Sequence, residues 1–476
     1  MLAGPGSHTP PARMPALPVW RKRGFDNDKN VMWLLRGFDK DSDKFWKGAA
    51  AECRRRLTEQ RIGPGAPGTM LMDVDTLLEA VGPEGIPTKS RNASLPLELL
   101  PALNLKMSHP VKLELDRPLL RDYPNLAGIF ILLRSLDLLQ KKGPRLILAP
   151  TALERWQGLN AAERYFALLD ALLFQAQTSM LGGESRREEN NTFEDVTFFL
   201  CGLRENWRNF KSYEASDTLS QHGEIPPWNL FVQQQLGLIE IRPASAALRK
   251  DVGPGTRGWI AGGAKLTPWG AAMAWGLLQC LNTYEHSLDE QSAAEEDEGA
   301  EPLDEQDRRT ATEILHPTFR PFFPEWRTIY ERPKHEAPAG TYLFKVTLAG
   351  WRGGAGDIWR RIAIPGFNSL DSLANAILKA FKLDDDHAYD FRYRDERGKN
   401  RIINHPLTDE GPFTPEVQLN ESGLLPGGKM TFVFDYGDHW EFHLRLERID
   451  PNTKEIYRPT VIESAGTPPP QYPICD

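Results

Sequence analysis

An acidic segment divides this chain of 476 residues and limits what it can fold into. Residues 285–307 contain 11 Asp/Glu and no Lys/Arg, and self-repelling charge of this density cannot be buried in a core. Removing these 11 negative charges from the formal net charge of −8 leaves +3, so the remainder is nearly neutral. We therefore expect an extended acidic linker between two folded parts, and we do not expect a uniformly basic nucleic-acid binder.

The N-terminus, the apolar runs and the cysteines predict a cytoplasmic protein. Residues 1–28 are rich in Pro and Gly, so we expect a disordered lead-in. The longest apolar run, 126–133, is too short to cross a membrane, and no membrane contact is expected. The cysteines are far apart in the sequence and are expected to be free thiols in a reducing compartment: Cys53, Cys201, Cys280 and Cys475.

The pattern before the linker is typical of a helical body. In residues 160–177 the apolar positions form one helical stripe, and Asn160 and Glu163 have the spacing of a capping box. Two longer stretches, 126–156 and 228–281, each contain a helix, a Gly turn, a short extended piece and a new helix. A weaker third instance lies near 76–97.

Helix, hairpin and helix in this order is typical of a winged-helix module, so we predict tandem winged-helix-like units. The functional interpretation is DNA binding through the helix before the wing. Charge supports it weakly, because residues 203–280 hold eight Lys/Arg against six Asp/Glu and the candidate recognition helix has Gln233, Gln234 and Gln235 but no Lys or Arg. A packing or protein-contact module is the favoured alternative, and any nucleic-acid contact is expected within 120–282.

After residue 340 the spacing of apolar residues changes, and they recur at every second position. Residues 341–348 alternate as a half-buried strand, a second strand follows at 358–364, and a helix capped by Asn368 and Asp371 must pack on the sheet. We therefore predict a C-terminal α+β domain with a mostly antiparallel sheet and one packed helix.

The hairpin at 430–446 allows its register to be argued. With a three-residue loop at 436–438, Phe434 lies opposite Trp440 and one face of the hairpin is continuously apolar. A two-residue loop would instead place polar and apolar residues on the same face. The preferred register also places Asp435 beside His439.

Five motifs follow one another in this half: Tyr342-x-Phe344-x-Val346, Ile358-Trp359-Arg360-Arg361-Ile362, Ala380-Phe381, His387-Ala-Tyr-Asp-Phe391 and Phe434-Asp-Tyr-Gly-Asp-His-Trp440. In this order they resemble the plasmid pRiA4b ORF-3-like family over about 340–450, and the helical body looks like the long N-terminal region of larger members. One departure is Phe442, where the family pattern usually has His, with His443 one step later. The resemblance implies a plasmid or mobile-element association and no catalytic assignment.

Four residues form the candidate ligand or partner contact: His387, Asp435, Asp438 and His439. Carboxylates with imidazoles can ligate a metal or exchange protons, but the spacing is not a metal-ligand pattern, and Asp and Gly are ordinary turn formers. We expect Asp435 and Asp438 to hold the turn, and we assign no catalytic residue, metal or cofactor. The structural motif residues are Trp359, Arg360, Arg361, Phe381, Phe391, Gly437 and Trp440.

The favoured function is a non-enzymatic interaction or adaptor protein with an unknown protein partner. The alternatives are a DNA-associated accessory protein acting through the winged-helix-like units and, third, a metal-dependent enzyme. The predicted organisation is a disordered lead-in at 1–28, a helical domain at 29–185, a winged-helix-like domain at 186–284, an acidic linker at 285–312, the α+β domain at 313–455 and a tail at 456–476.

Overall fold

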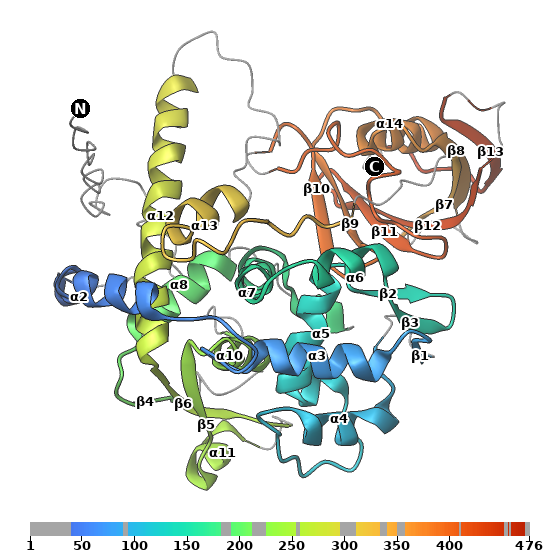
Figure 1. The fold of residues 1–476 in the computed structure, drawn as a ribbon. Coiled ribbons are helices and arrows are strands. Elements are labelled where there is room, and N and C mark those ends of the chain that lie inside the picture. The colour runs from blue at the N-terminus through green and yellow to red at the C-terminus, as the bar shows by residue number, and fades with distance from the viewer. Residues whose placement is uncertain are drawn as a thin grey trace, which may run out of the picture.

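The structure, a computed structural model, confirms an α+β protein and contains two hydrophobic cores (Figure 1). The first core is built by the helical body and the second by the C-terminal domain. The predicted lead-in at 1–28 lies outside the described residues. The structure describes residues 40–88, 94–181, 192–211, 225–253, 258–295, 311–333, 340–349, 358–408, 411–451, 456 and 458–471.

Helices dominate the body, as the sequence predicts. The capping box is confirmed: Asn160 Oδ1 accepts from the Glu163 N–H, and the Glu163 carboxylate accepts from the Asn160 N–H. The helices are α2 (Lys40–Glu59), α3 (Met70–Val81), α4 (Leu100–Lys106), α5 (Pro124–Ser135), α6 (Pro150–Gln157), α7 (Ala161–Asp170), α8 (Thr192–Gly202), α10 (Pro227–Gln235), α11 (Ala246–Val252), α12 (Pro268–Glu295) and α13 (Ala311–Phe319).

Two antiparallel sheets of three strands lie on different sides of the body (Figure 1). Their strand orders are β1-β3-β2 and β4-β6-β5, so the two units share one topology. The weaker third instance near 76–97 is not a separate unit, because its extended piece is β1 and pairs with β3. The strands are β1 (Ile86–Pro87), β2 (Leu139–Lys142), β3 (Arg145–Leu148), β4 (Arg208–Asn209), β5 (Ile239–Pro243) and β6 (Ala261–Leu266).

Helix α5 is the centre of the body, and every one of its residues is buried. Helix α10 crosses it so closely that a Cβ on Gly128 would lie 2.4 Å from Val232 Cγ2 and 2.9 Å from the Trp228 carbonyl oxygen. Only glycine admits this approach, since any side chain there would overlap the backbone of α10. The two helices that precede the hairpins therefore pack against each other.

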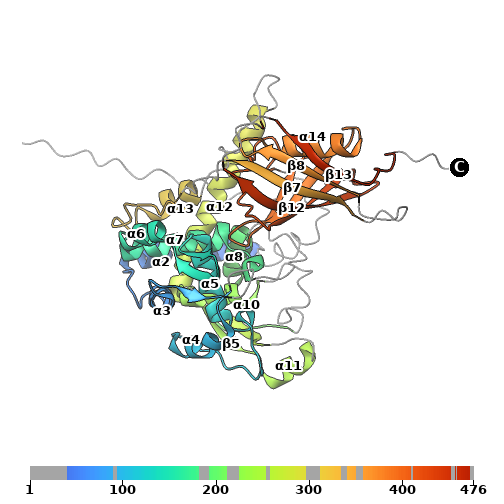
Figure 2. The ribbon, with the colours of Figure 1, turned by 90° about the vertical axis from the view of Figure 1, so that its right-hand side faces the viewer.

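The C-terminal domain is a seven-stranded antiparallel sheet with helix α14 (Leu370–Phe381) on one face (Figure 2). The predicted hairpin register is confirmed, with Phe434 opposite Trp440 and Phe432 opposite Phe442. The strand order is β10-β9-β11-β12-β7-β8-β13. The strands are β7 (Thr341–Leu348), β8 (Trp359–Pro365), β9 (Tyr389–Arg394), β10 (Asn400–Asn404), β11 (Lys429–Phe434), β12 (Trp440–Asp450) and β13 (Thr460–Ala465).

Two local details of this domain differ from expectation. The N-cap of α14 is Ser369, whose Oγ accepts from the Ser372 N–H, whereas the sequence analysis places the cap at Asn368. The segment 456–476, expected to be a tail, contains β13, which pairs with β8 at the edge of the sheet. Gln471 then hydrogen-bonds the backbone N–H of Asp384, so the domain continues past 455.

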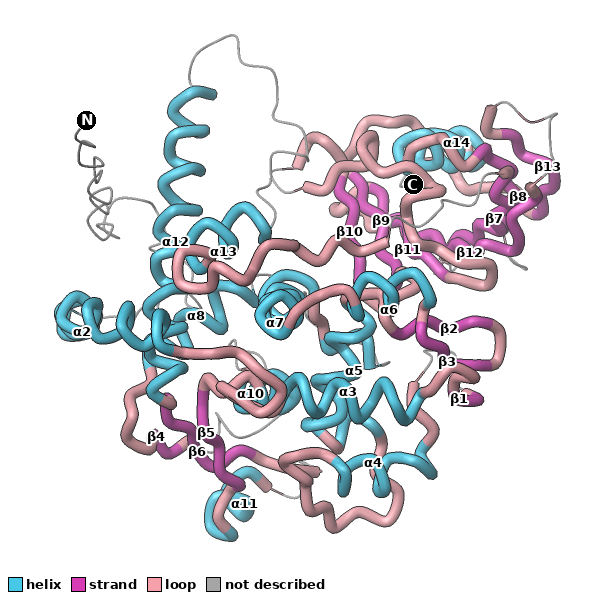
Figure 3. Tube along the Cα trace, in the orientation of Figure 1, coloured by secondary structure: helices cyan, strands magenta, loops and turns pink. Residues whose placement is uncertain are grey.

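Residues on both sides of the acidic stretch pack in the first core. Helix α12 continues to Glu295, so residues 285–295 of the acidic stretch are helical rather than extended; Ala, Gln and Glu are good helix formers. Helix α13 contributes Leu315 and Phe319 to the first core, and Trp326 follows them there. The predicted boundary at 313 stays a prediction, but these residues pack with the body (Figure 3).

Three of the cysteines, Cys53, Cys201 and Cys280, are buried free thiols, while Cys475 lies outside the described residues. Burial raises the pKa of Cys53 to about 11 and that of Cys280 to about 12, so both remain protonated at neutral pH. A search of the described helices finds none with the length and apolar character that a bilayer crossing requires.

We predict that a fragment of residues 340–472 unfolds cooperatively and that truncation to 340–455 destabilises it. The shorter fragment lacks β13 and Gln471, so β8 becomes an unprotected edge. We expect a loss of about 1–2 kcal/mol, which lowers the melting temperature by roughly 4–8 °C per kcal/mol. Thermal unfolding followed by circular dichroism measures the difference; equal melting temperatures would show that β13 adds no stability.

Candidate functional site

The hairpin tip between β11 and β12 is held by the side chain of Asp435. This carboxylate is buried, and its Oδ1 accepts from the backbone N–H of Gly437 at 2.9 Å and of Asp438 at 3.3 Å. Asp435 and His439 both have left-handed backbone with φ of 54°, and the His439 N–H donates to the Asp435 carbonyl. Asp438 takes part through its backbone N–H while its side chain is exposed.

The structure brings together only some of the four candidate residues. His387 Nε2 lies 3.4 Å from Asp435 Oδ2, whereas His439 Nε2 approaches Glu441 Oε2 at 3.7 Å. The other oxygen of Glu441 is 2.7 Å from His443 Nε2. A pair, His387 with Asp435, and a separate group in which Glu441 contacts His439 and His443 therefore replace one cluster. In the part of the chain that the structure describes, no group of three or more His, Cys, Asp or Glu side chains could hold a metal ion.

The two arginines of the Trp-Arg-Arg motif point to opposite faces of β8. Arg360 is buried and donates to backbone carbonyls at the end of α14 and of β13. Arg361 forms ion pairs with Glu447 at 2.8 Å and with Glu463. Its guanidinium lies 5.3 Å from the ring centroid of Trp359. Of the other motif residues, the second core holds Phe381, Phe391 and Trp440, and the turn holds Gly437.

The glutamines of α10 form hydrogen bonds within the body. Gln233 donates to Asn229, Gln235 donates to the buried Asp73 on α3, and Gln234 Oε1 accepts from the backbone of β5. The helix that would read DNA in a winged-helix protein therefore has its polar side chains engaged inside the body.

A buried ion pair joins the C-terminal domain to the body. Arg397, in the turn between β9 and β10, donates through two nitrogens to Asp137 at 2.6 and 2.8 Å. Asp137 follows α5 and is 1% exposed. Arg134, on α5, donates to two carbonyls of the same turn. Gly398, also in this turn, lies close to Met180 of the body: a Cβ on Gly398 would be 3.2 Å from the Met180 Cα. Gly398 has a φ of 86°, which favours glycine.

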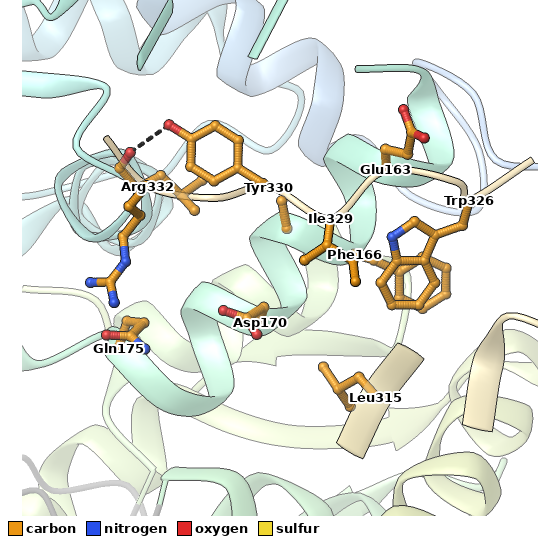
Figure 4. A pocket seen from close by; sticks show the side chains of 11 residues that line it. Glu163, Phe166, Asp170, Gln175, Leu315, Trp326, Ile329, Tyr330 and Arg332 are labelled. Carbon is orange, nitrogen blue, oxygen red and sulfur yellow. Dashed lines mark hydrogen bonds between the residues drawn. The ribbon is translucent and has the colours of Figure 1, made fainter. Parts of the chain in front are cut away.

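A small cavity of about 40 Å³ lies near this junction, between α7 and the chain at 326–332 (Figure 4). Phe166 and Trp326 stack at 4.0 Å on one side. Asp170 and Arg332 line the other side, and the Tyr330 hydroxyl donates to a backbone carbonyl at the end of α5. A volume of this size holds a few waters but no substrate of ordinary size.

Burial shifts the pKa values of the charged groups around this cavity. Desolvation raises the pKa of Asp170 to about 7, opposed by the positive charge of Arg332, and desolvation lowers the pKa of Arg332. In the docked turn, burial followed by the charge of Arg401 lowers the pKa of Lys399 to about 8. These shifts follow from burial, and the cavity is too small for a substrate of ordinary size.

The sequence analysis named none of these junction residues. The turn Asp395-Glu-Arg-Gly-Lys399 has the composition of an ordinary exposed hairpin turn, and Asp137 lies in an ordinary helix-to-strand connection. Their roles arise because residues about 260 positions apart in sequence meet in space.

Comparison with known proteins supports the C-terminal domain. Residues 340–472 match the family model described as Plasmid pRiA4b ORF-3-like protein, which confirms the resemblance expected for this region. No curated protein matches the chain significantly. A crystal structure of a protein of unknown function, MM3350 from Methanosarcina mazei Go1, is similar at 22% identity, covering 28% of this chain and 73% of that chain with a TM-score of 0.25. These comparisons assign no molecular activity.

We predict that Asp435→Ala destabilises the C-terminal domain by about 1–3 kcal/mol, because two backbone N–H groups lose their acceptor and alanine is strained at positive φ. Asp435→Asn should cost less, since an amide oxygen can accept the same bonds. Asp438→Ala should change stability by less than about 0.5 kcal/mol. Urea unfolding of residues 340–472 measures all three; a larger loss for Asp438→Ala would contradict the assignment.

We predict that Asp170 makes folding stability fall as pH rises from about 4 to 7. Its folded pKa of about 7 lies above the ordinary value of 3.8, so in this window the folded state holds a proton that the unfolded state has released. Asp170→Asn should remove this slope and raise stability at pH 8 by up to about 4 kcal/mol, the free energy that corresponds to the difference between these two pKa values. Melting temperatures from pH 5 to 8 test it, with the exposed Asp116→Asn as control; parallel curves for wild type and Asp170→Asn would refute it.

Proposed function

We propose that this protein is a non-enzymatic interaction or adaptor protein of a plasmid- or mobile-element-associated family, built on two winged-helix-like units. The topology supports the units: a helix, a strand, a further helix and a hairpin occur twice, and the strand orders β1-β3-β2 and β4-β6-β5 are equivalent. The C-terminal domain is docked on the end of the first unit by the Arg397–Asp137 pair.

The packing of α5 on α10 argues for a scaffold and against DNA readout by these helices. A recognition helix must present its side chains to the major groove. Here α5 is buried along its whole length, and most of α10 is buried as well. Inserting either helix into DNA would require the two units to separate and expose the first core.

The observation that carries the proposal is an apolar surface on the turn at 97–99 and on α4. Leu97 is 46% exposed, Leu99 37% and Leu105 76%, and Pro101 and Ala102 are exposed among them. Helix α4 lies at the end of the body remote from the C-terminal domain (Figure 1). Exposed apolar residues gathered on one element are typical of a protein-contact site.

We predict that Leu97→Glu together with Leu105→Glu reduces recovery of a protein partner by about tenfold, because a charge would be buried in the contact. The measurement is quantitative affinity purification of the full chain from its native host, with proteins and nucleic acids both identified. The matched control is Leu407→Glu, since Leu407 is 81% exposed but lies in the C-terminal domain.

The proposal fails if no protein co-purifies in near-stoichiometric amount, or if the double variant and the Leu407→Glu control recover the same partner equally. Circular dichroism of the double variant shows whether the fold is retained, and these exposed positions are expected to tolerate glutamate.

A further inference from the structure

The β4-β6-β5 sheet carries an exposed tryptophan next to two cations. Trp207, just before β4, is 40% exposed. The Arg242 guanidinium lies 4.7 Å and the Lys265 ammonium 5.3 Å from its ring centroid. In the sheet register Arg242 on β5 and Asn209 on β4 both pair with Gly263 on β6. Position 263 must be glycine, because a Cβ there would lie 2.4 Å from the Arg208 carbonyl oxygen of β4.

The charged side chains at Trp207 leave a small positive charge on this face. Arg242, Lys265 and Glu240 lie together here, which gives a net charge of +1, whereas the whole chain carries −8. Glu240 faces the patch and pairs with Lys265 at 3.0 Å, but its side chain is 55% exposed, where a competing anion can displace it at little cost. The net positive charge around an exposed aromatic favours an anionic ligand with flat rings.

A similar group on the C-terminal domain provides an internal comparison. Trp359 has Lys345 at 4.9 Å and Arg361 at 5.3 Å from its ring centroid. There, however, two carboxylates, Glu447 on β12 and Glu463 on β13, form ion pairs with the arginine. The two cations of that group are therefore balanced by two carboxylates, whereas the two cations at Trp207 have one, Glu240.

We propose that the β4-β6-β5 face binds single-stranded nucleic acid, with a base stacked on Trp207 and the phosphates contacting Arg242 and Lys265. Aromatic platforms flanked by cations are the means by which proteins bind unpaired strands, because stacking needs a free base face and the backbone supplies the charge. A duplex offers no such base face. This inference goes beyond the proposed function and uses a surface separate from α4.

The test is fluorescence anisotropy of the full chain with labelled oligonucleotides of about 12 nucleotides: single-stranded DNA, single-stranded RNA and the matching DNA duplex. We expect both single strands to bind more tightly than the duplex, and the two arms distinguish DNA from RNA as the ligand. Trp207→Ala should raise Kd about tenfold, while Trp207→Phe, which keeps a stacking ring, should stay within about threefold.

The cations are tested by salt dependence. Arg242→Gln and Lys265→Gln should each reduce the slope of log Kd against log salt concentration by about 0.7, the value for one phosphate contact to a single strand. Trp359→Ala is the matched control and should leave Kd unchanged. Melting temperatures of the Trp207 variants confirm that they are folded, and Trp207→Phe keeps the test decisive if Trp207→Ala is unstable.

Several results would overturn the proposal. These are the absence of binding at low salt, tighter binding of the duplex, equal Kd for Trp207→Ala and wild type, or an equal loss in Trp359→Ala. Competition by poly-glutamate as effective as by unlabelled oligonucleotide would also overturn it, since it would show a face that binds any polyanion. None of these outcomes depends on the α4 surface.

Discussion

The complete burial of helix α5 is the constraint on which the rest of the structure depends. A helix without a solvent-facing side must be covered all round, and here the two hairpin-containing halves of the body cover it together. The crossing with α10 is possible only because position 128 is glycine, so one residue sets how closely the two units approach. The polar residues at the N-terminal end of α5 extend this contact: Asn125 donates to Asn104 on α4, and the carbonyl of Asn125 lies within hydrogen-bond reach of Gln235.

The other end of α5 holds the C-terminal domain. Arg134 and Asp137 receive the β9–β10 turn through charge-assisted hydrogen bonds in a place where little water competes. A pair of this kind contributes geometric specificity more than net stability, because both charges lose hydration on burial. The same helix thus joins the two units to each other at its middle and the domain to the body at its end. Burial near this junction raises the pKa of Asp170 and lowers that of Lys399.

This organisation separates the surfaces that remain for partners. The helices before the hairpins are withdrawn from solvent, which leaves the apolar surface of α4 and the cationic face around Trp207 on the outside of the body. The hairpin tip of the C-terminal domain, the part of the sequence with the densest polar motif, is largely accounted for by folding. Asp435 holds the turn and Arg360 satisfies backbone carbonyls, so a polar motif that resembles a site is explained by local structure.

The sequence by itself determined the elements whose cause is local or periodic. The alternation at 341–348, the hairpin register at Phe434 and Trp440 and the capping box at Asn160 all follow from contacts within a few residues or across one turn. It also indicated the two hairpin units and the resemblance of the C-terminal domain to the plasmid pRiA4b ORF-3-like family. Tertiary structure alone decided that α5 packs against α10, that β13 pairs with β8, and that Arg397 forms an ion pair with Asp137. Hydrophobic periodicity specifies that a face is buried but not by what, and a charged turn has the same composition whether it meets solvent or a carboxylate 260 residues away.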